Sequence, residues 1–136
     1  MSAAGVRTIM STWPAISHAN IEGEHRKLAN RHWTEPTAAA LVHAALIHAV
    51  LGQPERALEY RREALALAER IGHPNTHAYV LHYAALSCQL QDDARGALAL
   101  AEQCHALASE HWLRLFTEWS GLLRAWADAP LAHPAQ

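Results

Sequence analysis

The chain has 136 residues, 51% of them hydrophobic, and a formal net charge of -2 at pH 7 with neutral histidines. A chain of this length is expected to form one domain that buries about two-thirds of the surface exposed by its unfolded form. The near-neutral charge lacks the strong basic excess that nucleic-acid binding usually requires, so no nucleic-acid partner is expected.

Neither membrane insertion nor secretion is expected from this sequence. No run of about 18 apolar residues is present, as a membrane helix requires, and the segment 1–14 lacks the apolar core of a secretory signal. The two cysteines, Cys88 and Cys104, form no Cys-x-x-Cys pair and are expected to be buried free thiols, with a disulfide as the alternative. We therefore expect a cytoplasmic protein with no membrane partner.

The chain is expected to divide into an N-terminal segment at 1–23, a helical repeat domain at 24–129 and a disordered tail at 130–136. Abundant alanine and leucine favour helix through intrinsic propensity. Thr34 or Thr37 is the predicted N-cap of the first helix, Asn75 or Thr76 that of the third, and Pro130 is predicted to stop the last. The predicted helices are, in chain order, Thr37–Leu51, Pro54–Ile71, His77–Leu90, Ala94–Glu110 and Leu113–Ala127.

The sequence contains an internal repeat, in which the segment 38–68 matches the segment 78–108 at ten identical positions. Each unit is predicted to form two helices that cross closely at small residues, which are Ala45, Ala57, Ala85 and Ala97, with Ala64 and Cys104 further along. Gly52 is placed in the turn between the helices of the first unit, Asp92 replaces it in the second, and Gly72 is predicted to end the second helix in a left-handed conformation. A third copy begins near Phe116 and stops after one helix.

This arrangement of small residues is typical of the tetratricopeptide repeat (TPR), although the common TPR has a shorter period of about 34 residues. The predicted fold is all-α: a short right-handed TPR-like α-solenoid of antiparallel helix pairs with a period of about 40 residues. Such arrays usually need three or more repeats for stability, so a homo-oligomer formed through the last helix is a possible assembly.

Three stretches also resemble a known family. They are HRKLANRHWTEPTAAAL at 25–41, GQPERAL at 52–58 and REALALAERIGHP at 62–74. Residues 24–127 resemble the C-terminal TPR region of large bacterial signalling proteins. These proteins combine a class III adenylate cyclase or transcription-factor domain with an AAA-type ATPase and helical repeats. The chain contains no Gly-x4-Gly-Lys-Ser/Thr loop for a nucleotide phosphate. The resemblance therefore implies a non-catalytic regulatory or scaffold module without a cofactor.

A protein or peptide partner is expected on the inner face of the array, which the first helix of each unit lines. The residues predicted to bind it are Val42, Leu46, Tyr79, His82, Leu86 and Gln89, with Leu122 beside them on the last helix. Trp112, Trp119 and Trp126 are spaced by seven and are predicted to share one face of that helix. This face either caps the core or forms an exposed surface for a partner or a second copy.

Eleven histidines permit an alternative function, a sensor that binds a small ligand or a metal ion. His18, His25 and His32 are spaced by seven, but no His-Glu-x-x-His pattern is present. We predict no metal site, and we expect His48 to be a packed core histidine because TPR units often carry tyrosine at this position.

Overall fold

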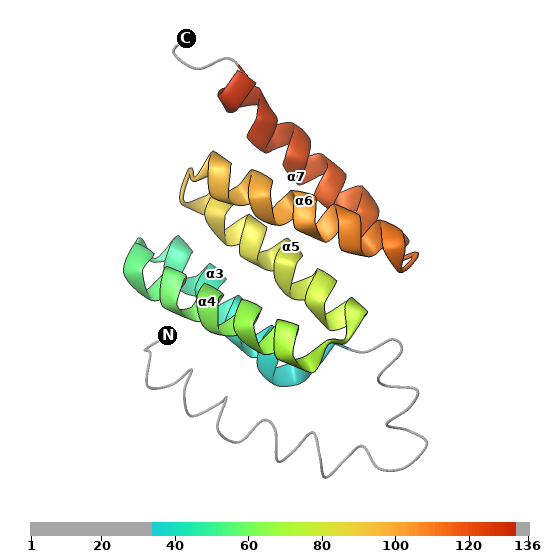
Figure 1. The fold of residues 1–136 in the computed structure, drawn as a ribbon. Coiled ribbons are helices and arrows are strands. Elements are labelled where there is room, and N and C mark those ends of the chain that lie inside the picture. Colours follow the sequence, from blue (N-terminus) through green and yellow to red (C-terminus); the bar gives the residue numbers. More distant parts are fainter. Residues whose placement is uncertain (1–33, 133–136) are drawn as a thin grey trace.

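The computed structural model describes residues 34–132. Over these residues the chain is all-α and contains no strand. The helices, labelled as in Figure 1, are α3 (Pro36–Val50), α4 (Pro54–Ile71), α5 (Pro74–Leu90), α6 (Ala94–Glu110) and α7 (Arg114–Ala132).

The helices stack in chain order, with α3 and α4 at one end and α7 at the other (Figure 1). Each helix packs against the next one in the chain, and α5 also contacts both α3 and α7. The helices α3, α5 and α7 therefore lie next to one another in one layer, and α4 and α6 pack onto that layer. No helix among the described residues is long and apolar enough to cross a membrane.

The predicted bounds of the second and fourth helices are confirmed, but the predicted N-caps of two others are wrong. Glu35 caps α3, and its carboxylate accepts a hydrogen bond of 2.8 Å from the amide of Ala38. Helix α5 begins at Pro74, three residues before the predicted start, and its N-cap is His73. Proline suits the first turn because it has no amide hydrogen to leave unpaired there. Thr76 is instead buried, and its hydroxyl accepts a hydrogen bond of 3.0 Å from the amide of Glu35.

The last helix is longer than predicted. It continues through Pro130 to Ala132 instead of ending at Ala127. Pro130 removes one hydrogen bond to the preceding turn and crowds a carbonyl there, and the helix ends two residues after it. Residues 130–132 thus belong to α7 and not to a disordered tail. The rest of that predicted tail and the segment at 1–23 lie outside the described residues.

The predicted turns are confirmed at the level of the backbone. Gly52 has a φ of 70°, and Asp92, its equivalent in the second unit, has a φ of 56°. Gly72 ends α4 with a φ of 67° and donates its amide hydrogen to the carbonyl of Ala68. Trp112, which follows the second helix of the second unit, has a φ of 58°. All four residues adopt the left-handed conformation that ends a helix or reverses the chain.

Small residues fill the centre of the stack, as the sequence predicts. The residues predicted for the helix crossings are fully buried, and they are Ala45, Ala57, Ala64, Ala85, Ala97 and Cys104. Their short side chains let neighbouring helix backbones approach closely. The two cysteines are confirmed as free and buried. Burial raises the pKa of the Cys104 thiol to about 11, so this thiol stays protonated at neutral pH.

Candidate functional site

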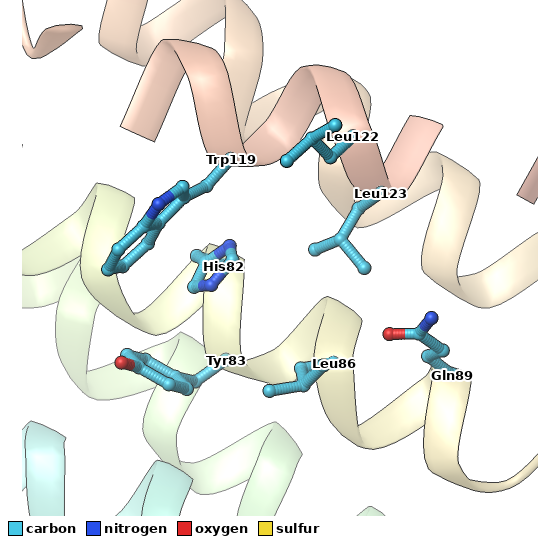
Figure 2. A pocket seen from close by; sticks show the side chains of 7 residues that line it. All are labelled: His82, Tyr83, Leu86, Gln89, Trp119, Leu122 and Leu123. Carbon is cyan, nitrogen blue, oxygen red and sulfur yellow. The ribbon is translucent and has the colours of Figure 1, made fainter. Parts of the chain in front are cut away.

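A pocket of about 400 Å³ lies between α5 and α7 (Figure 2). The lining side chains come from two helices that are not consecutive in the chain. They are His82, Tyr83, Leu86 and Gln89 from α5, and Trp119, Leu122 and Leu123 from α7. The spacing of three and four positions places each set on one face of its helix. The pocket is thus mostly apolar, with His82 and Gln89 as polar groups.

His82 lines this pocket and has three aromatic rings around it. Its ring centroid lies 4.9 Å from that of Trp119, 4.9 Å from that of Tyr83 and 6.2 Å from that of Phe116. The side chain is 8% exposed, and its buried Nδ1 atom has no hydrogen-bond partner among the described residues. Burial lowers the pKa of His82, so the ring is neutral at pH 7. A neutral imidazole can donate or accept one hydrogen bond without placing a charge among these rings.

The aromatic rings continue from the pocket to α3. Tyr79 lies 4.6 Å from Tyr83 between ring centroids, and its hydroxyl lies 2.6 Å from Nε2 of His43. Burial, with a smaller contribution from Tyr83, raises the pKa of Tyr79, and burial lowers the pKa of His43. Both groups are therefore neutral at pH 7, and their hydrogen bond joins α3 to α5. We call this set of rings the aromatic cluster: His43, Tyr79, His82, Tyr83, Phe116 and Trp119.

The structure brings together several of the residues that the sequence predicts for partner binding. His82, Leu86, Gln89, Trp119 and Leu122 line the pocket, and Tyr79 belongs to the adjoining aromatic cluster. Tyr83 and Leu123 also line the pocket but are not among the residues predicted from the sequence. Each lies one helical turn after a residue that was predicted, Tyr79 or Trp119, so the helical period was the signal that could have identified them.

Two predicted residues on α3 lie elsewhere. Val42 is fully buried in a core cluster with Tyr60 and Val80, so its prediction as a partner-binding residue is wrong. The reason is that α5 covers this part of α3. Leu46 is half-buried on the same helix and does not line the pocket.

The prediction that the three tryptophans share one face of the last helix is wrong, because Trp112 is not part of the helix. Trp112 lies in the turn before α7, which begins only at Arg114, and its side chain is 92% exposed. Trp119 lines the pocket, whereas Trp126 is half-buried and packs against the core cluster around Ala127.

The last helix has a buried side and an exposed side. The residues at one face of α7 are buried, namely Phe116, Ser120, Leu123 and Ala127. On other sides of the helix, the side chains of Leu115 and Leu122 are 52% and 71% exposed. The helix therefore covers part of the core and also presents apolar side chains to solvent.

The histidines in the described part of the chain serve mainly as packing and hydrogen-bonding groups. His48 is confirmed as a core residue: its ring stacks on that of Tyr60, and its Nδ1 atom lies 2.5 Å from the side-chain oxygen of Gln53. His105 lies 3.2 Å from the hydroxyl of Ser120 and so joins α6 to α7. Between residues 34 and 132 no group of three or more potential metal ligands is placed to hold an ion. His18, His25 and His32 lie outside the described residues.

Comparison of the chain with protein-family models, with curated proteins and with solved structures finds no significant match.

Proposed function

We propose that this protein is a non-catalytic TPR-like interaction module, a short right-handed solenoid of antiparallel helix pairs that binds a segment of another protein. The observation that carries this proposal is the pocket between α5 and α7, which side chains from the first helices of two consecutive units line. By its family resemblance the module would be a regulatory or scaffold part of a bacterial signalling or transcription system in the cytoplasm.

The positions of the left-handed residues support a repeat of about 40 residues, longer than that of the common TPR. Gly52 and Asp92 reverse the chain at equivalent points of the two units, and Gly72 and Trp112 do so after α4 and α6. Helices α4 and α6 also begin at equivalent points, Pro54 and Ala94. Side chains on the first helices of such an array line a continuous inner surface, which suits a helical or extended segment of a partner.

The chemistry of the pocket favours an apolar anchor residue on the partner. Aromatic and leucine side chains supply most of its lining, and such pockets typically contribute most of the binding energy of an interface. Gln89 can pair with a backbone group of a bound segment. His82 can do so through a ring nitrogen, which would offset the cost of its buried position. No lining residue carries a formal charge, so the pocket selects against a charged anchor.

The proposal can be tested with peptides selected from a random phage-displayed library against the full chain and then measured by fluorescence anisotropy. Leu86→Asp places a carboxylate in the pocket and is expected to weaken binding of the selected peptides at least about tenfold, or about 1.4 kcal/mol. Leu51→Asp is the control, because Leu51 is an exposed leucine in the turn after α3 and does not line the pocket. Circular dichroism checks that both variants fold. Equal loss of binding in the two variants, or failure to select any peptide, would refute the proposal.

A further inference from the structure

One face of α7 lacks the cover that the equivalent faces of α3 and α5 have. Ala45 and Ala85 are fully buried, whereas Ala125, the equivalent residue of the third copy, is exposed. Ala38 and Ala78 are likewise fully buried, and Glu118, their equivalent, is exposed. In the first two units the second helices, α4 and α6, pack along α3 and α5. Helix α7 packs against α6 and α5, but in the described part of the chain no helix follows it to cover its other side (Figure 1).

The uncovered face borders a second depression, of about 280 Å³, between α6 and α7. Its lining residues are Leu98, Glu102, Gly121, Arg124, Ala125 and Asp128. It is distinct from the pocket around His82, with which it shares no residue. Two of its three charged residues are acidic, which favours a segment that carries positive charge.

The sequence before α3 carries such a segment. Residues 24–31, EHRKLANR, match residues 63–70 of α4, EALALAER, at Glu24, Leu28, Ala29 and Arg31. The same Leu-Ala pair recurs in α6 at 107–108, and Ala68 and Ala108 are both fully buried. A proline that begins a first helix follows in each case, Pro36 after the first segment and Pro74 after the second. Residues 24–31 therefore have the sequence pattern of a second helix.

The net charge of residues 1–33 is opposite in sign to that of the rest of the chain. Residues 1–33 contain four lysines and arginines and two acidic residues, whereas residues 34–132 contain seven arginines and eleven acidic residues. Three of the four basic residues, Arg26, Lys27 and Arg31, fall within 24–31. They complement the carboxylates of Glu102 on α6 and Asp128 on α7, which line the depression beside the uncovered face.

We propose that two copies of this chain bind head to tail, with residues 24–31 of one copy lying along the uncovered face of α7 of the other, as α4 lies along α3. The inference rests on the repeat arrangement proposed above. A second copy is the favoured occupant because residues 24–31 precede α3, which lies at the opposite end of the stack from α7 (Figure 1). The two contacting surfaces differ, so each added copy presents a new α7 and the assembly can grow.

The test is light scattering and sedimentation of the full chain over an about hundredfold range of concentration. The average mass is expected to rise above that of the 15.0 kDa monomer as concentration increases, and to fall as salt increases. Ala125→Arg in the uncovered face and Leu28→Glu in the N-terminal segment are each expected to give a monomer. Ala106→Arg is the matched control, because Ala106 is an exposed alanine on α6 that does not line the depression. It should associate like the natural sequence.

Mixing the two defective variants distinguishes this arrangement from others. Ala125→Arg keeps an intact N-terminal segment and Leu28→Glu keeps an intact α7, so an equimolar mixture is expected to form a 1:1 dimer and nothing larger. A mixture that stays monomeric would overturn the proposal. Leu28→Glu that still dimerises on its own would also overturn it, in favour of a symmetric contact between two α7 helices. The proposal would also be overturned if the natural sequence stayed monomeric at every concentration. That result is expected if each chain covers its own α7. Leu86→Asp should self-associate normally, so failure of peptide binding and failure of self-association can be told apart.

Discussion

Gly72 and Trp112 have the same left-handed backbone conformation, which is unstrained for glycine and strained for tryptophan. Both have a positive φ at the end of a second helix, 67° and 58° respectively. A Cβ atom in this conformation costs about 1–2 kcal/mol, and glycine avoids that cost. Trp112 bears the cost while its side chain is 92% exposed, so little packing compensates for the strain within the described part of the chain.

This difference predicts opposite effects of two substitutions. Trp112→Gly is expected to raise the free energy of unfolding by up to about 1 kcal/mol, because relief of strain is partly offset by the greater freedom of glycine in the unfolded chain. Gly72→Ala is expected to lower it by about 1 kcal/mol. Urea denaturation followed by circular dichroism measures both changes. A clear loss of stability in Trp112→Gly would show that the tryptophan side chain makes a stabilising contact.

At the scale of the element, three helices carry alanine at equivalent positions with different surroundings. Ala45 in α3 and Ala85 in α5 are fully buried where a neighbouring helix approaches, and Ala125 in α7 is exposed. The amino acid and the helix type are the same in all three cases. Only the presence of a packed neighbour differs, which makes these residues a matched set for the close helix crossings.

Leucine at these positions is expected to reveal that difference. Ala45→Leu and Ala85→Leu should each lower the free energy of unfolding by about 1–3 kcal/mol or more, because the added atoms have no space at a closely packed crossing. Ala125→Leu should change it by less than about 0.5 kcal/mol in dilute protein, since its side chain extends into solvent. If Ala125→Leu and Ala85→Leu lowered the free energy of unfolding equally, the result would contradict the finding that no helix covers Ala125.

At the scale of the whole molecule, burial of several histidines makes stability depend on pH. Burial lowers the pKa of His43, His77 and His82 below the ordinary value of 6.5. At His77 the nearby Glu69 opposes part of this effect. Between the lowered pKa values and 6.5 the unfolded chain binds more protons than the folded chain, so stability decreases as pH falls through this range. Above about pH 7.5 these groups are neutral in both states and contribute no pH dependence.

The melting temperature is therefore expected to decrease on acidification from about pH 7.5 to about pH 5.5. His82→Phe keeps an aromatic ring in the pocket and removes the titration, so it should make this decrease smaller. Each unit by which a folded pKa lies below its unfolded value corresponds to about 1.4 kcal/mol. The same change at His111, which is exposed, serves as the control for replacing a histidine by phenylalanine. An identical acid response in His82→Phe and the natural sequence would count against a contribution from His82.

The sequence by itself determined where most helices lie and where the chain turns, because these features depend on local chemistry. Proline and glycine at 52–54, Gly72 and the acidic pair at 92–93 set the helix ends within a residue or so. The repeated alanines likewise identified the helix crossings, since close approach requires small side chains wherever it occurs. The predicted N-caps were wrong because several neighbouring residues could cap each helix. The actual N-caps are Glu35 and His73, not the nearby threonine or asparagine residues.

Only the tertiary structure decided which apolar side chains remain available for binding. Val42, His82 and Leu122 hold equivalent positions in the three copies of the repeat, yet the first is fully buried, the second is 8% exposed and the third is 71% exposed. Their periodicity is the same, but the exposure of each side chain depends on which helices pack over it. The pocket exists for the same reason, because it needs α5 and α7 side by side, with Trp119 and His82 facing each other across the gap (Figure 2).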